Sequence, residues 1–338
     1  MHTKVQALSR ALFGVLACVA SLMAPPAAAN DYPLRPEVRA FMQDLVARHA
    51  FDAQALDALF AQVRRSDTAI RLMTPAPTGA KRSWQAYRAR FIDANRIETG
   101  LRFWHDHAAT VARASQHYGV PEEIIIAIIG VETVFGRITG EHRVIDVLST
   151  LSFDYLRRAD YFRSELEQFL LLARTEGFDP LEIRGSYAGA IGLPQFMPGS
   201  IRRWAVDFDG DGRVDLRHST ADAIGSVANF LAEHGWQPGA PARYAVRIAD
   251  PRRIGPLIDA GITPSFTPDA LRDYGVASLD PVGEDTRLAL IDLPNGDDPP
   301  DYWLGAQNFF VITRYNRSSF YASAVLDLAE ALRRRSGP

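Results

Sequence analysis

Apolar residues recur at helical spacing between residues 31 and about 115, which predicts a series of helices. Pro36 suits the first turn of one helix, and Asp52 suits the N-cap of the next. The apolar positions of these two helices are Val38, Phe41, Leu45, Val46, Leu56, Leu59, Phe60 and Val63. A loop with proline and glycine follows at 74–83. A longer helix is expected from about 95 to 118, ended by Gly119.

The segment at 120–140, VPEEIIIAIIGVETVFGRITG, is apolar on all sides over its first half. Pro121 suits a first helical position, and Glu122 and Glu123 suit the positive end of the helix dipole. A helix that is apolar all round is a buried helix. A strand is the alternative for so many β-branched residues, but the start signals and the length favour a helix.

Between about 241 and 305 the pattern changes to short apolar runs separated by proline, glycine and aspartate. The runs at 242–248 and 286–293 are typical of strands joined by turns. Helical spacing returns from Ala306 and is clear at 322–332. The chain is therefore predicted to be mainly α (α+β), with one small β domain.

The first 29 residues have the pattern of an export signal. Lys4 and Arg10 precede an apolar run at 11–24 that is too short for a stable membrane anchor, and three alanines follow at 27–29. We therefore expect a periplasmic protein. The only cysteine, Cys18, lies in this run, so the cleaved chain would have no disulfide. An alternative stays open, since residues 15–18 loosely resemble a lipobox that would make Cys18 the lipidated N-terminus of an outer-membrane lipoprotein.

Composition and charge narrow the class of protein. The chain has 338 residues, with 47% hydrophobic and 23% charged residues, which is typical of a globular protein. Removing residues 1–29 leaves 35 basic against 40 acidic residues, a net charge of −5. That balance gives no electrostatic footprint for nucleic acid.

Glu132 stands at the end of the apolar run and is the strongest candidate for acid catalysis. A carboxylate there is costly to ionise, so burial favours the protonated form and raises its pKa. A general acid working near neutral pH needs such a raised pKa. The alternative is a helix-end glutamate paired with Arg137 or Arg143.

A second motif, SYAGAIGLPQFMPGS at 186–200, is rich in small residues that allow the backbone to approach another surface closely. Gln195 offers a donor and an acceptor, and Ser186 and Tyr187 offer hydroxyl groups, which suits sugar binding. The alternative is a tight structural turn that packs on a helix.

The segment DFDGDGRVDL at 207–216 matches the start of an EF-hand calcium loop. The candidate ligands are Asp207, Asp209, Asp211 and the carbonyl group of Arg213. Asp215 occupies position nine, but His218 replaces the glutamate expected at position twelve, so Asp222 is the candidate that closes a longer loop. Clustered aspartates repel one another without a cation, which favours a structural Ca²⁺ over a solvated acidic turn.

Taken together, these segments resemble the B-type membrane-bound lytic murein transglycosylases, a family with a lysozyme-like core. The matching stretches are GVETVFGRITG, LRRADYFRSELEQFLLLAR, YAGAIGLPQFMPGSI, VDFDGDGRVDL followed by DAIGSVANFLAEHGW, and TRYNRSSFYASAV. The domains that the resemblance implies are a helical domain at 30–115, a lysozyme-like catalytic core with the EF-hand-like loop at 116–240, a small β domain at 241–305 and a helical return to the core at 306–338.

The resemblance also implies an activity and a set of site residues. Glu132 would be the sole catalytic acid and base in cleavage of the β-1,4 bond between N-acetylmuramic acid (MurNAc) and N-acetylglucosamine (GlcNAc) of peptidoglycan, leaving 1,6-anhydro-MurNAc ends without a cofactor. The residues implied for the saccharide groove are Ser186, Gln195, Tyr315, Asn316 and Tyr321. Arg157 and Arg158 match basic positions near the peptide stem, and the aspartate loop matches a calcium site with Asp222 as its late ligand.

Three positions depart from the family pattern: Phe230 replaces a frequent tyrosine, Leu193 and Pro194 give the second motif an unusual loop, and the calcium loop is slightly long before Asp222. Two other functions stay open, a lysozyme-type hydrolase on the same scaffold and a non-catalytic peptidoglycan-binding protein. The expected partners are peptidoglycan glycan strands, with cell-wall synthesis proteins as further candidates. We expect a monomer.

Overall fold

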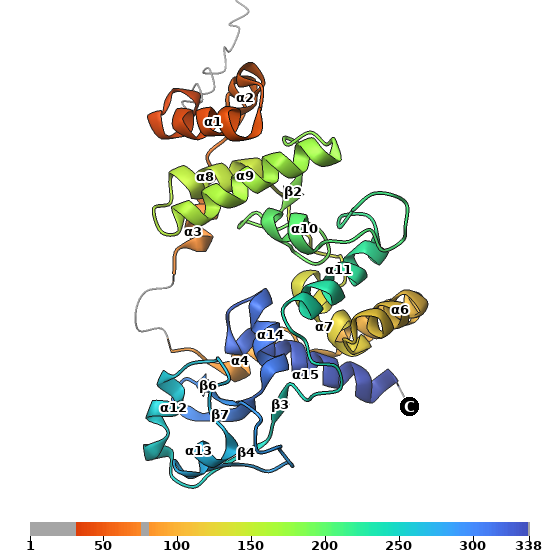
Figure 1. Ribbon diagram of the computed structural model, residues 1–338, viewed down its shortest axis with the longest axis vertical. Helices are drawn as coiled ribbons and strands as arrows, with labels where there is room; N and C mark the ends of the chain where they lie inside the picture. The colour runs from red at the N-terminus through yellow and green to blue at the C-terminus, as the bar shows by residue number, and fades with distance from the viewer. Residues whose placement is uncertain (1–31, 76–80, 337–338) are drawn as a thin grey trace, which may run out of the picture.

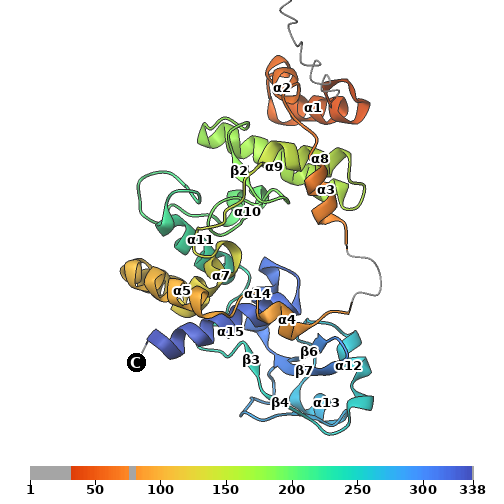
Figure 2. The ribbon, with the colours of Figure 1, turned by 180° about the vertical axis from the view of Figure 1, so that it is seen from behind.

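The computed structural model describes residues 32–75 and 81–336. The predicted signal segment at 1–29, with Cys18, lies outside the described residues. Figures 1 and 2 show an elongated molecule with α1 and α2 at one end and the sheets of residues 243–305 at the other. Within the described ranges, no helix has both the length and the apolar character needed to cross a membrane.

Helices make up most of the chain, which confirms the mainly α prediction. The N-terminal elements are η1 (Tyr32–Leu34), α1 (Pro36–His49), α2 (Ala53–Phe60), α3 (Asp67–Met73), α4 (Trp84–Arg88), α5 (Ala94–Asp106) and α6 (Ala108–Tyr118). The middle elements are α7 (Glu122–Thr133), β1 (His142–Arg143), α8 (Val144–Phe153), α9 (Ala159–Glu176), β2 (Arg184–Gly185), α10 (Pro198–Trp204) and α11 (Thr220–Glu233).

The residues of the predicted N-terminal helical domain lie in two places. The first part lies beside α8 and α9: the hydroxyl group of Tyr32 donates a hydrogen bond to Asp154, which follows α8, and Arg48 of α1 forms an ion pair with Glu167 of α9 at 2.8 Å. By contrast, α5 contacts α7 and α15. The prediction of a single helix at 95–118 is wrong, because the chain leaves helical geometry at His107. The ring of His107 packs on that of Phe103, with ring centroids 4.6 Å apart.

The apolar segment after residue 120 forms the central helix α7, which contradicts the strand alternative. Pro121 is its N-cap with an extended backbone and is not inside the first turn as expected. Every residue from Ile124 to Val131 is buried, since α5, α6, α11 and α15 all contact this helix. The apolar side chains on every face of α7 are therefore covered by the surrounding helices.

The β region consists of two small antiparallel sheets. The strands are β3 (Arg243–Tyr244), β4 (Val246–Ile248), β5 (Val276–Ser278), β6 (Ala289–Asn295) and β7 (Asp298–Gly305), with orders β3-β7-β6 and β4-β5. Both predicted runs contain strands, although the first divides into β3 and β4 and the second begins only at Ala289. Three short helices lie between β4 and β5: η2 (Pro251–Arg253), α12 (Gly255–Asp259) and α13 (Pro268–Arg272).

This region has a hydrophobic core of its own. Its buried members are Ile254, Leu257, Leu271, Val276, Leu288, Leu290, Leu304 and Ala306. The chain then returns through α14 (Gln307–Tyr315) and α15 (Ser319–Ser336), and α15 packs along α7. The return brings residues near 320 beside the end of α7, although the division of the chain into domains stays a prediction.

Candidate active site

Glu132 is the penultimate residue of α7, directly after the buried apolar turns. Its side chain is partly buried, and Tyr321 of α15 donates a hydrogen bond to its Oε1 at 2.6 Å. In the described part of the chain the side chain of Glu132 has no other hydrogen bond and no ion pair. The alternative of an arginine partner is not supported, because Arg143 binds Asp146 at 2.6 Å.

The surroundings of Glu132 favour the protonated acid. Burial raises its pKa to about 7, and the hydrogen bond from Tyr321 opposes this shift by stabilising the carboxylate. Burial also raises the pKa of Tyr315 and Tyr321 well above the usual range of a phenol, so both hydroxyl groups keep their protons. One oxygen of Glu132 is thus held by Tyr321, and Oε2 is the atom left to carry an acidic proton.

The chain turns sharply after Glu132. Val134, Phe135 and Gly136 all have left-handed backbones, with φ values of 52°, 58° and 85°. Such a conformation costs on the order of 1–3 kcal/mol for a residue with a side chain. The turn folds the Phe135 ring back onto α7, where a Cβ atom on Gly130 would lie 2.5 Å from it. Because Gly130 has no side chain, the Phe135 ring can pack on α7 and the chain can reverse direction beside Glu132.

A cavity of about 370 Å³ borders Tyr315 and is lined by residues of α9, α10, α11 and α14 and of the second motif. Gln195, Tyr315 and Phe230 line it, whereas Glu132 does not. The connection to Glu132 runs through Tyr315, whose ring stacks on that of Tyr321 with a centroid distance of 6.3 Å. The acid and the cavity wall are thus connected by this aromatic pair, of which Tyr321 is buried.

The polar groups of the second motif are fixed by their own loop. Gln195 has a left-handed backbone, and its Nε2 donates to the carbonyl groups of Thr139 at 3.0 Å and Gly192 at 2.8 Å. Its side-chain carbonyl oxygen remains to accept from a ligand. Ser186 Oγ accepts from the amide of Ala190 at 3.0 Å, so its hydroxyl proton is left to donate.

The last predicted groove residue, Asn316, and the two arginines predicted near the peptide stem are less closely gathered. Asn316 is exposed at the end of α14. Arg157 and Arg158 are exposed in the turn before α9, and the guanidinium of Arg158 lies 4.2 Å from the ring centroid of Tyr161, a residue of the cavity wall. Arg158 is therefore next to the cavity, and the roles of all three stay predictions.

Two titratable residues of the cavity wall were missing from the sequence prediction. Glu165 accepts from the amide of Gly199 at 2.7 Å, and burial raises its pKa. His234 stacks on Phe230 at 4.0 Å, and burial lowers its pKa. Glu165 lies in α9 and His234 directly follows α11, which is distant in sequence, so no local pattern could have indicated them.

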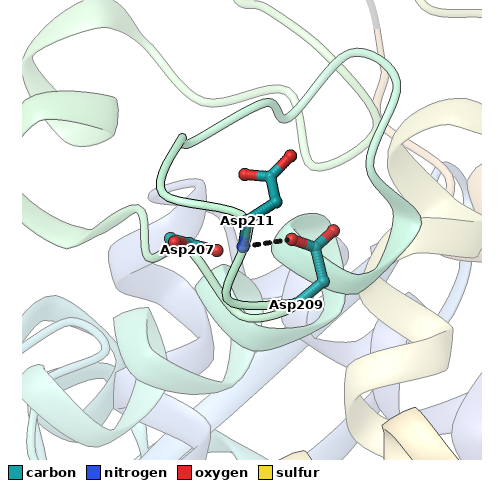
Figure 3. A group of neighbouring side chains, drawn as sticks. All are labelled: Asp207, Asp209 and Asp211. Atoms are coloured by element: carbon teal, nitrogen blue, oxygen red, sulfur yellow. Dashed lines mark hydrogen bonds between the residues drawn. The ribbon is translucent and has the colours of Figure 1, made fainter.

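The aspartate loop lies between α10 and α11, and carboxylate oxygens of Asp207, Asp209 and Asp211 lie within 4.8 Å of one another (Figure 3). Such a set of hard oxygen donors suits Ca²⁺. Asp222 is buried at the start of α11, and its oxygens accept from the amides of Phe208 and Asp215, each at 2.8 Å. The buried carboxylate of Asp222 therefore stabilises the loop through its backbone amides, and it is not one of the three gathered carboxylates.

The rest of the loop is organised by local bonds. The amide of Arg213 donates to Asp211 at 2.8 Å, and Asp215 binds His218 at 2.7 Å. Asp215 and His218 are thus paired with each other, and Arg213 as a carbonyl ligand stays a prediction.

Comparison with known proteins decides the family. The model of the transglycosylase SLT domain matches residues 33–330. The chain belongs to this family. It is 41% identical over 311 residues to membrane-bound lytic murein transglycosylase B of Escherichia coli strain K12, covering 90% of this chain and 84% of that protein.

Solved structures give the same answer and confirm the lysozyme-like lytic transglycosylase fold. The soluble lytic transglycosylase SltB1 of Pseudomonas aeruginosa is 45% identical, with a TM-score of 0.82 over 90% of this chain and 100% of that one. Slt35 of Escherichia coli in complex with calcium is 40% identical, with a TM-score of 0.81, and the match covers 91% of this chain and 96% of that one. SltB3 of Pseudomonas aeruginosa in complex with NAG-anhNAM-pentapeptide is 30% identical, with a TM-score of 0.75 over 88% and 79%.

The hydrogen bond from Tyr321 predicts a pH effect. In Tyr321→Phe the carboxylate of Glu132 loses its donor, so its pKa should rise from about 7 by roughly one further unit. A general acid is active in its protonated form, so with Glu132 in this predicted role kcat/KM on peptidoglycan fragments should fall at higher pH than in the wild type. Tyr274→Phe in the small β region is the matched control. If kcat/KM of Tyr321→Phe fell at the same high pH as in the wild type, the role assigned to the hydrogen bond from Tyr321 would be contradicted.

Proposed function

We propose that the protein is a lytic transglycosylase that cleaves the β-1,4 bond between MurNAc and GlcNAc of peptidoglycan and leaves 1,6-anhydro-MurNAc ends. The observation that carries the proposal is Glu132, a partly buried acid with a pKa of about 7 and one oxygen held by Tyr321. Near neutral pH this group exists in both protonation states, as an acid that also serves as a base must.

In the first step, the proton of Glu132 passes from Oε2 to the glycosidic oxygen, and the bond from that oxygen to the anomeric carbon of MurNAc breaks. The positive charge that develops at this carbon is stabilised by the N-acetyl group of the same sugar. Substrate assistance of this kind is a known exception to the use of two carboxylates.

In the second step, ionised Glu132 removes the proton of the MurNAc 6-hydroxyl group, and the oxygen attacks the anomeric carbon. The product is the 1,6-anhydro sugar, and Glu132 is protonated again. Attack within one sugar has a large entropic advantage over the capture of a water molecule.

The environment of Glu132 favours this route over a two-carboxylate hydrolase. Burial and Tyr321 are the causes of its pKa shift, and no neighbouring carboxylate in the described ranges contributes. A retaining hydrolase needs a second carboxyl group about 5 Å away. The complex of SltB3 with an anhydro-sugar peptide also supports an anhydro product for this family.

For substrate binding we propose the surface that joins Glu132 to the cavity. The residues are Ser186, Gln195, Tyr315, Asn316 and Tyr321 for the glycan and Arg157 and Arg158 for the peptide stem. Support comes from the side-chain oxygen of Gln195, the free proton of Ser186 and the stacked tyrosines, which together offer the polar and aromatic groups that sugars need.

The proposal predicts that Glu132→Gln lowers cleavage of purified sacculi by at least about 10²-fold, because the amide cannot donate the proton. Thermal unfolding checks that the variant is folded. Glu98→Gln, at a glutamate of α5 with a 69% exposed side chain, is the control and should retain most of the activity.

Mass spectrometry of the wild-type products separates the candidate reactions. Anhydro ends lack one water relative to the reducing ends of a hydrolase. Reducing ends would establish the lysozyme-type reaction, and intact sacculi with retained binding would establish the non-catalytic alternative.

We further propose a structural Ca²⁺ in the aspartate loop, held by Asp207, Asp209 and Asp211, with the carbonyl group of Arg213 and Asp222 as the remaining candidates. The gathered carboxylates support it, as does the calcium complex of Slt35. Calcium would neutralise the mutual repulsion of the three side chains and stabilise the connection between α10 and α11.

Calcium should therefore raise the thermal unfolding temperature relative to protein in EDTA. At a free concentration of about 100 times Kd, the stabilisation would be about 2.7 kcal/mol. Asp209→Asn should abolish the shift, whereas Asp160→Asn, at an aspartate with a 97% exposed side chain, should retain it. An equal shift in both variants would mean that calcium binds elsewhere.

For localisation we propose an exported protein of the periplasm, either released after residue 29 or lipidated at Cys18 in the outer membrane. The pattern of residues 1–29 supports export, and the relative named as membrane-bound supports an anchored form. A monomer with cell-wall synthesis proteins as candidate partners completes the proposal.

A further inference from the structure

We infer that Thr133 is a positioning residue: its buried hydroxyl group fixes Glu132 relative to the segment that carries Gln195. The inference rests on the proposed function, since it concerns how the acid is placed against the sugar. Thr133 was not singled out in the sequence, because a threonine at a helix end carries no chemical signature.

The hydroxyl group of Thr133 joins three pieces of backbone. The side chain is fully buried, and Oγ1 accepts from the amide of Gly136 at 3.0 Å. Oγ1 lies 3.0 Å from the carbonyl oxygen of Leu193 and 3.2 Å from that of Ile129. We assign the single hydroxyl proton of Thr133 to the carbonyl oxygen of Leu193, since that contact is shorter and the carbonyl oxygen of Ile129 already accepts from the amide of Phe135.

The first of these bonds closes the left-handed turn from inside. Val134 and Phe135 occupy a conformation that side chains disfavour, so the turn persists only where the surroundings hold it. The bond from Gly136 to Thr133 spans both residues. Without it, the last turn of α7, which carries Glu132, would be free to move.

The second bond ties that turn to the second motif. Leu193 donates its amide to the carbonyl of Leu216 at 2.9 Å and accepts from Thr133 with its own carbonyl. The next carbonyl, of Pro194, accepts from the hydroxyl of Tyr315 at 2.6 Å. Gln195 is thus anchored at both preceding residues.

Two routes therefore connect Glu132 to the same short segment. One runs through the neighbouring Thr133 to Leu193. The other runs through Tyr321 and the stacked Tyr315 to Pro194. A pair of routes fixes orientation as well as distance, which matters because a misplacement of 1 Å can lower a rate about 10²-fold.

The test compares Thr133→Val with Thr133→Ser on solubilised glycan strands, with kcat and KM measured by chromatography of the products. Valine keeps the volume and loses the hydroxyl group, whereas serine keeps the hydroxyl group and loses a methyl group. We expect Thr133→Val to lower kcat by about 10- to 100-fold with KM changed less than about threefold, and Thr133→Ser to stay within about threefold of the wild type in both.

A role in packing alone predicts the opposite order, because serine leaves a small cavity and valine does not. Wild-type kcat in Thr133→Val, or an equal loss in both variants, would overturn the inference. Thr133→Ala and Thr133→Ser form a second pair, which differs by one oxygen and decides the question where Thr133→Val fails to fold.

The wild-type products are analysed in the same experiment. Anhydro products together with an unaffected Thr133→Val variant would refute the role of Thr133 alone. Reducing ends in the wild type would refute the proposed transglycosylase reaction, while the order of the variants would still report on the positioning of Glu132.

Discussion

The burial of one carboxyl group at the end of an apolar helix is the constraint on which the site depends. Seven apolar residues of α7 lie within the core, and four helices contact this one, so Glu132 emerges from a region that does not solvate charge. Its pKa rises to about 7 because ionisation is penalised there. Tyr321 limits this rise and fixes the orientation of the group. Placing such an acid beside a sugar requires the chain to leave α7 at once, which it does in the left-handed turn at Val134.

The other parts of the fold can be understood as supports for this placement. The C-terminal helix α15 returns along α7 and brings Tyr321 to the acid, although the two residues are 189 positions apart. The second motif is bonded to Thr133 on one side and to Leu216, in the loop that leads to α11, on the other. That bond places the aspartate loop one hydrogen bond away from the segment before Gln195, a residue of the cavity wall, so an ordered loop also orders this segment.

The sequence predicted those features that local chemistry determines. The buried character of α7, Glu132 as its charged end and the three alternating aspartates are all visible in short stretches, and the family resemblance supplied Tyr315 and Tyr321. Features that depend on contacts between distant segments were not predictable. Glu165 and His234 come together only as lining of the folded cavity, and the link from Thr133 to Leu193 spans 60 residues. Asp222 matched a ligand position, yet its carboxylate is used by backbone amides.

The most direct test of the central claim is a titration of Glu132 itself by carbon NMR, with the side-chain carboxyl carbon of glutamate labelled and the signal assigned by its loss in Glu132→Gln. The account predicts a midpoint near pH 7, more than two units above the ordinary value of 4.5. A midpoint near 4.5 would contradict it, because the group would then be ionised at neutral pH and would have no proton to give to the glycosidic oxygen.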